Sequence, residues 1–191
     1  MKKTSLLLIT CITFCSTLIA QDKKDAPKWD VSNPQGTYKD VNFTTSEGTW
    51  MNLDVSPDGK EIIFDLLGDI YTMPVTGGTA TVLRSGHAFE VQPRFSPDGK
   101  KILFTSDRDK KSREIYTMNV DGSNVRRLTE NDLFEEVPTW SKDGSKILFT
   151  RQLEEWVDTV KTTNGEIFIM DKNGKNEKRL TFRAGFDSGA K

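Results

Sequence analysis

The chain has 191 residues, a formal net charge of −1 at pH 7 and one histidine. Because there is no basic excess, the sequence offers no electrostatic footprint for nucleic acid or for an acidic membrane surface. Both cysteines, Cys11 and Cys15, lie in the first 20 residues, so the rest of the chain lacks disulfides and the cysteine and histidine sets of the common zinc sites.

Residues 1–20 have the composition of an export signal. Lys2 and Lys3 precede an uncharged, mostly apolar run of sixteen residues (5–20), and Ala20 stands before the polar sequence QDKKD. A charged, an apolar and a small-residue region in this order are typical of a cleaved signal peptide. Sixteen residues are short for a membrane-spanning helix, which needs about 20; an uncleaved anchor and a lipoprotein anchor are the alternatives. We therefore predict a periplasmic or secreted protein with no membrane span after signal cleavage.

Residues 21–40 form a polar lead that contains Trp29 and two prolines. The sequence leaves open whether this lead has no regular structure or lies along the domain that follows. That domain is expected over residues 41–191, where one sequence motif, here called the phrase, occurs three times.

The repeated phrase keeps its spacing from copy to copy. Each copy is aligned on the glycine of a predicted turn: Gly59, Gly99 and Gly144. An apolar triplet follows (IIF, ILF and ILF), then DIYTM, EIYTM or EIFIM, and then a leucine ten residues after the methionine of that phrase. The first period is 40 residues and the second 45, measured on the serine that opens each turn. Constant steps of this kind indicate a structural repeat.

Each copy is expected to contain four short strands. The triplets are too short for helices, and their apolar residues on both faces indicate strands buried on both sides. In SPDG (96–99), proline presets φ, aspartate suits the third position and glycine takes the positive φ that closes a hairpin. A second hairpin is marked by VDG (120–122) and KNG (172–174). Four antiparallel strands in about 40–45 residues are typical of a β-propeller blade; a sandwich of irregular hairpins is the alternative.

We predict an all-β fold: a partial β-propeller of about three four-stranded antiparallel blades, over about residues 45–86, 87–131 and 132–183. Closed propellers have about four to eight blades. The two end blades are therefore expected to expose apolar faces that promote self-association. Three alternatives stay open: the chain is the front part of a longer protein, two copies close a six-bladed ring, or the chain is a short and poorly stable product.

The phrases SPDGK-x-I-x-F-x-S-D, I-Y-x-M-x-x-D-G and R-x-L-T resemble the TolB-like (WD40-like) propeller repeat of exported bacterial proteins. The resemblance covers about residues 41–187, and copy one departs from it at Pro74 and Gly77-Gly78. The sequence EGTWMNLDVSPDG followed by FDLLGDIYTMPVTGG resembles the opening of the propeller that precedes the amidohydrolase domain of some large secreted enzymes. This resemblance implies a propeller that binds a partner, or one that filters and orients substrate for a catalytic domain elsewhere.

No catalytic, cofactor-binding or metal-binding residue is predicted. His87 stands alone before an aromatic residue, which is typical of a surface or packing histidine. Asp58, Asp98 and Asp143 recur because each hairpin uses an aspartate. The sequence has neither a G-x-S-x-G nucleophile motif nor a glycine-rich loop with phosphate-cradle spacing. We therefore expect that this chain is not an enzyme by itself.

One connection varies in length and predicts the binding face. From the apolar triplet to the next phrase the step is six residues in copy one, eleven in copy two and eighteen in copy three. Insertions confined to one hairpin fall on one face of a propeller, often the binding face. The loops that lead into each blade should open there, with their acids at the channel mouth and a loop tryptophan as anchor. The candidate residues are Lys110, Lys111, Arg113, Glu154, Glu155, Trp156, His87, Glu90, Glu135 and Asp187.

Two functions fit these predictions. The first is an exported, non-catalytic propeller module that binds a protein or a cell-envelope polymer and no nucleic acid. The second is the N-terminal propeller portion of a larger secreted hydrolase, of the amidohydrolase or prolyl-peptidase type. In that case the catalytic domain is not in this chain.

Overall fold

The computed structural model describes residues 36–39, 41–109, 112–157, 159–183 and 185–190. The predicted signal peptide (1–20) and the first part of the polar lead (21–35) lie outside the described residues. Within the described ranges, no helix has the length and the apolar character needed to cross a membrane.

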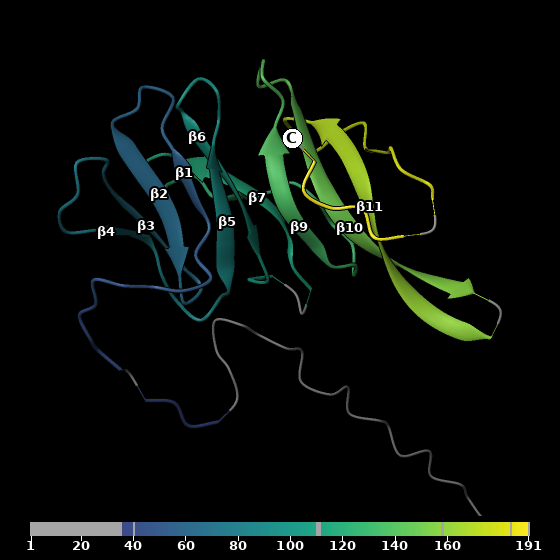
Figure 1. The fold of residues 1–191 in the computed structure, drawn as a ribbon, viewed down its shortest axis with the longest axis horizontal. Helices are drawn as coiled ribbons and strands as arrows, with labels where there is room; N and C mark the ends of the chain where they lie inside the picture. The colour runs from purple at the N-terminus through teal and green to yellow at the C-terminus, as the bar shows by residue number, and fades with distance from the viewer. Residues whose placement is uncertain (1–35, 40, 110–111, 158, 184, 191) are drawn as a thin grey trace, which may run out of the picture.

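The described strands form three four-stranded antiparallel sheets, here called blades 1, 2 and 3 (Figure 1). Blade 1 holds β1 (Leu53–Val55), β2 (Glu61–Leu66), β3 (Asp69–Pro74) and β4 (Thr81–Arg84). Blade 2 holds β5 (Glu90–Phe95), β6 (Lys101–Ser106), β7 (Glu114–Asn119) and β8 (Arg126–Arg127). Blade 3 holds β9 (Glu135–Trp140), β10 (Lys146–Val157), β11 (Val160–Asp171) and β12 (Lys178–Arg179).

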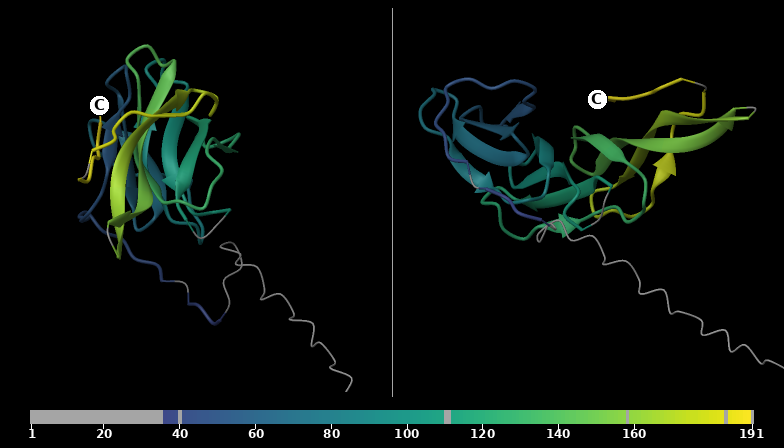
Figure 2. Two further views of the ribbon diagram at one scale, coloured as in Figure 1. Left: turned by 90° about the vertical axis from the view of Figure 1, so that its right-hand side faces the viewer. Right: turned by 90° about the horizontal axis from the view of Figure 1, so that it is seen from below.

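In every blade the strands neighbour one another in chain order, so each blade is a simple meander. The right-hand view of Figure 2 shows the three sheets following one another along a curve, like adjacent sectors of an incomplete ring. This arrangement confirms the predicted all-β fold, a partial propeller of three four-stranded blades.

The turn between the first two strands of each blade has the predicted chemistry. In blade 2, Gly99 N donates to Ser96 O at 2.8 Å, and the Ser96 hydroxyl donates to Asp98 at 2.6 Å and accepts from Lys101 N at 2.9 Å. Gly99 has a φ of 66°, a left-handed conformation that glycine adopts at little cost. The turn of blade 3 keeps these bonds although it lacks the proline, so aspartate and glycine suffice to form it.

The core lies between the blades rather than within one sheet. On β6, Ile102 and Phe104 pack against blade 1, whereas Leu103 packs against blade 3. Successive residues of a strand point to opposite faces, so an apolar triplet serves two interfaces at once. All three side chains are at most 1% exposed, which confirms the prediction of burial on both sides. Burying a side chain of this size contributes roughly 1.5–3 kcal/mol.

The loops that lead into blades 2 and 3 each cross the hairpin between the second and third strands of the preceding blade. Glu90 N donates to Gly68 O at 2.8 Å, and Glu135 N donates to Arg113 O at 3.0 Å. Asp187 N makes the same bond to Gly165 O at 2.8 Å. The backbone at Phe186-Asp187 therefore repeats the contact made by the two earlier lead-in loops.

The longest of the three variable connections is not a loop. β10 and β11 are each 12 residues long, and they stay paired from Lys146↔Asp171 out to Val157↔Val160. The expectation that this connection is a loop is wrong, because its residues extend the two strands into a ribbon (151–166). Figure 1 shows this ribbon projecting beyond the other strands of blade 3.

Candidate functional site

One end of the blades, here called the hairpin face, gathers the three variable connections and the lead-in loops. The backbone bonds from Glu90, Glu135 and Asp187 hold each lead-in loop against a hairpin. The structure therefore places most of the candidate residues at this end of the molecule. Lys110 and Lys111 lie outside the described residues.

The ribbon presents an exposed candidate side chain, Trp156, which is 70% exposed. It stands opposite Lys161 in the β10–β11 pairing, so the two side chains share one face of the ribbon. Lys161 forms an ion pair with Glu154 at 2.6 Å, diagonally across the strands. An indole flanked by charged groups is the arrangement of an interface anchor with a polar rim.

Arg113 has a bridging position rather than a free one. Its guanidinium lies 4.5 Å from the centre of the Phe89 ring and 4.8 Å from that of Phe134. Cation–π contacts on two sides tie together the lead-in loops of blades 2 and 3. His87 is exposed, and its ring meets Tyr38 edge-on at 5.0 Å. These contacts organise the loops next to the ribbon.

Glu90 and Glu135 are buried inside the blades, not at an open channel mouth. They are only 2% and 0% exposed. Glu90 pairs with Arg84 at 3.5 Å and with Arg108. Glu135 accepts from Arg151 Nε at 2.7 Å and from the Asn131 amide at 2.8 Å. Because their carboxylates are enclosed by chain donors, they are unsuited to contact an external ligand.

Two further buried glutamates are also paired with arginines. Glu114 pairs with Arg127, and Glu166 pairs with Arg179 at 2.7 Å. In the sequence each arginine stands thirteen residues after its glutamate: the glutamate opens the phrase EIY or EIF, and the arginine opens the tripeptide RLT. Sequence reasoning missed these pairs, although this constant step was a signal for them.

The electrostatics of the buried carboxylates differ from one to the next. Burial raises the pKa of Glu135, against the opposing effect of the Arg151 guanidinium. Burial also disfavours ionisation of Glu166, but the Thr181 hydroxyl and Arg179 outweigh it and hold the pKa of Glu166 below its usual value. Removing one partner of such a pair leaves a buried charge uncompensated, which costs about 3–5 kcal/mol. These pairs are therefore parts of the scaffold under the hairpin face.

Among the described residues, no cluster of histidine, cysteine, aspartate and glutamate side chains could hold a metal ion. The hairpin face presents an exposed indole, exposed charges and a ribbon that positions them.

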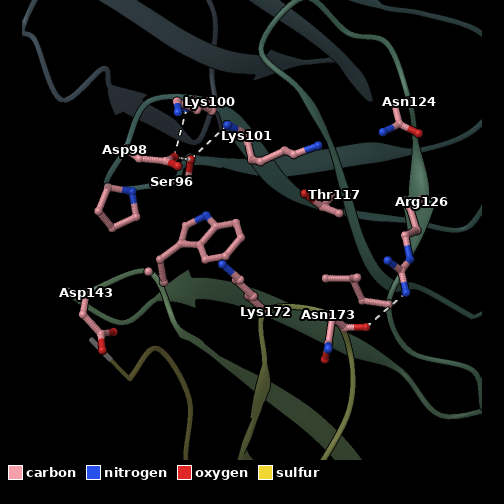
Figure 3. A pocket seen from close by; sticks show the side chains of 14 residues that line it. Ser96, Asp98, Lys100, Lys101, Thr117, Asn124, Arg126, Asp143, Lys172 and Asn173 are labelled. Carbon is pink, nitrogen blue, oxygen red and sulfur yellow. Dashed lines mark hydrogen bonds between the residues drawn. The ribbon is translucent and has the colours of Figure 1, made fainter.

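The opposite end, here called the turn face, contains a cavity of about 420 Å³ between blades 2 and 3. Its walls come from the SPDG turn and fourth strand of blade 2 and from both turns of blade 3. Figure 3 shows Lys100, Lys101, Arg126 and Lys172 around this space. Trp140 and Leu128 provide apolar lining. This site was not predicted from the sequence, because its residues come from segments that are far apart in the chain.

A family model and one solved structure with 27% sequence identity agree with the architecture. The family described as the tricorn protease N-terminal beta propeller domain matches residues 54–164. The structure of a putative TolB from Agrobacterium tumefaciens is 27% identical with a TM-score of 0.60, covering 71% of this chain and 50% of that one. The propeller domain of the Trilobed protease from Pyrococcus furiosus is 15% identical with a TM-score of 0.49, over 68% and 42% of the two chains.

A sequence relative is also found among curated proteins. An uncharacterised protein of Agrobacterium fabrum is 40% identical over 57 residues, which are 28% of this chain and 20% of that protein. The chain thus spans half or less of the length of the proteins it matches.

Proposed function

Because this chain belongs to the family of tricorn protease N-terminal β-propeller domains, we propose that it is a non-catalytic binding module whose hairpin face engages a protein or a cell-envelope polymer. The β10–β11 ribbon carries this proposal. It is the feature in which the three blades differ most, since blade 1 closes the same hairpin with only Leu67 and Gly68.

The ribbon is suited to recognition because it holds an anchor in place before binding. Backbone pairing along the 12-residue strands fixes the direction of the Trp156 side chain. A preorganised aromatic group loses less conformational entropy on binding than a loop residue does. Tryptophan is enriched among the residues that dominate interface energies, where truncation costs about 2–4 kcal/mol. Lys161 and Glu154 beside it would set the orientation of a partner.

We place this module in the periplasm or outside the cell. The composition of residues 1–20 and the similarity to a putative TolB support that location. Fractionation of cells that express the chain tests it: the processed protein should leave the cytoplasmic fraction and lack the first 20 residues. Full-length protein that stays in the cytoplasm would contradict the location.

Site-specific photo-crosslinking tests the binding role. A benzoylphenylalanine at position 156, introduced into the chain in its native host, should give discrete adducts with an envelope component. The matched control carries the same group at Trp50, which is 99% exposed and precedes β1. Adducts at position 156 and none at position 50 support the proposal. Equal labelling at both positions, or none at either, overturns it.

A second candidate is the propeller portion of a larger secreted hydrolase, whose propeller would filter or orient substrate. The description of the matching family as a protease domain favours it. An antibody against the three blades distinguishes the two candidates. A hydrolase portion predicts a polypeptide much longer than 191 residues on a blot of native cells, and that polypeptide should carry hydrolase activity after immunoprecipitation.

A further inference from the structure

We infer that the cavity on the turn face between blades 2 and 3 is a binding site for an acidic saccharide. This site is separate from the hairpin face, and its test does not depend on the proposed function. The cavity volume of about 420 Å³ falls within the range of roughly 300–1,000 Å³ typical of small-molecule sites. Its lining brings together charge, apolar surface and uncharged hydrogen-bonding groups.

The charge of the lining favours an anion. Four cations, Lys100, Lys101, Arg126 and Lys172, face two carboxylates, Asp98 and Asp143. Each carboxylate accepts the serine hydroxyl of its own turn at 2.6 Å, so both are engaged by the chain. Lys101 donates to the neutral amide of Asn119, and Arg126 donates to the backbone oxygen of Asn173. Neither of these two contacts neutralises a positive charge, although the Asp121 carboxylate lies close enough to Lys101 to interact with it.

The repeat provides an internal comparison that separates function from architecture. The strand pairing makes Lys101 equivalent to Glu61 and Arg126 equivalent to Thr81 in the wedge between blades 1 and 2. By the same alignment, Lys172 corresponds to Val120. The fold therefore does not require cations at these positions. Their concentration in one of two equivalent wedges points to a ligand rather than to packing.

The remaining lining favours a sugar over a simple inorganic anion. Trp140 and Leu128 offer an apolar surface for the carbon face of a sugar ring. Thr117 and Asn173 offer hydrogen-bonding groups for its hydroxyls. The buried Trp140 Nε1 and Thr117 Oγ1 make no hydrogen bond to any residue that the structure describes. A polar ligand or a water that reaches them would offset a desolvation cost of about 1–3 kcal/mol each.

Calorimetric titration of the full chain with trigalacturonate tests the site, with neutral galactotriose and a short Asp-Glu peptide as competing probes. Among these probes, we expect only trigalacturonate to bind, and we expect high salt to weaken its binding because Lys100, Arg126 and Lys172 are exposed. Lys172→Ala and Arg126→Gln should each weaken binding about tenfold or more, as expected for loss of a hydrogen bond to a charged group. Both side chains are exposed, so the variants should fold; thermal melting checks this.

Lys60→Ala is the matched control, because Lys60 is the counterpart of Lys100 in blade 1 and does not line the cavity. Its affinity for trigalacturonate should stay within twofold of the wild type. Absence of binding at millimolar trigalacturonate overturns the inference, and so does equal binding of galactotriose or of the peptide. Equal effects of Lys60→Ala and Lys172→Ala would show a diffuse charge effect and overturn it too.

Discussion

The same pair of stacked rings stands in two different settings in blades 1 and 2. In blade 2, Phe104 and Tyr116 lie 5.7 Å apart and are 0% and 2% exposed, because blade 1 covers them. In blade 1 the equivalent rings, Phe64 and Tyr71, lie 5.5 Å apart, but Tyr71 is partly exposed. The repeat gives every blade the same ring-bearing face. That face becomes part of the core only where a neighbouring blade covers it.

The exposed side of blade 1, here called the free face, can be traced through the strand register. Leu53 pairs with Phe64, Phe64 with Tyr71, and Tyr71 with Val82, so these four side chains form one row across the sheet. Leu53 and Val82 are 57% and 53% exposed and Tyr71 is partly exposed, whereas Phe64 in the middle of the row is only 8% exposed. A contiguous apolar surface of this kind marks a contact site or an aggregation risk.

The largest expected effect comes from truncating the covered ring pair. Phe104→Ala should lower the free energy of unfolding by about 4 kcal/mol, because it opens a cavity in a fully packed interface. Phe64→Ala, the matched change in blade 1, should cost about 2 kcal/mol, since its stacking partner Tyr71 is partly exposed and lets solvent enter the space left by the ring. Urea unfolding of both variants measures the difference. Equal losses would mean that the free face is as well covered as the interface.

The second effect concerns the buried charges of the interior. Arg151→Met should destabilise the fold by about 3 kcal/mol, because Glu135 keeps a buried charge without its main partner. The comparison variant is Lys146→Met, which breaks the Lys146–Asp171 pair on the exposed part of the same strand. Loss of that pair should lower the free energy of unfolding by at most about 1 kcal/mol. Denaturant midpoints for the two variants that agree within error would contradict this difference.

The sequence predicted those parts of the fold that depend on local chemistry. The SPDG turns and the apolar triplets stand where the constant spacings put them, because each is determined by a few adjacent residues. The ribbon was missed because the long connection between Phe149 and Ile167 was interpreted as a loop. The β-branched residues Val160, Thr162 and Thr163 were a signal for strand that the length overrode.

The candidate site was less predictable, since its features depend on residues from distant segments. The sequence shows an acid at Glu90 and at Glu135, but only the packing shows that Arg108 and Arg151 enclose them. The turn-face cavity likewise exists only because blade 3 lies against blade 2. Trp156, by contrast, was identified from the variable connection alone, and its role as an anchor stays a prediction.

The free face should also promote self-association. We expect a concentration-dependent dimer in sedimentation velocity, because the free face of blade 1 repeats the surface by which blades 2 and 3 each pack on the blade before them. Tyr71→Lys should raise the dissociation constant more than tenfold, since it buries a charge in that contact. Val160→Lys, at an exposed site on the ribbon, is the control. A wild-type chain that stays monomeric at high concentration would contradict the expectation.

The smallest effect is expected at the turns, which are local and should not depend on a neighbouring blade. The Ser141 hydroxyl, with further hydrogen bonds from Ser145, lowers the pKa of Asp143 from 3.8 to about 2. A depressed carboxyl pKa favours the folded state above pH 3.8, and this contribution is lost as the pH falls through about 2. Ser141→Ala should therefore move the pKa of Asp143 back toward 3.8.

Carbon-detected NMR titration of the aspartate carboxyls measures this shift. The Ser96 hydroxyl likewise lowers the pKa of Asp98 in the middle blade. Ser96→Ala should raise the pKa of Asp98 in the same direction, although Ser96 is only 4% exposed and Ser141 is more accessible. Like responses in both blades would show that the turns are built by their own four residues. A shift confined to one blade would mean that packing between blades governs the turns as it governs the rings.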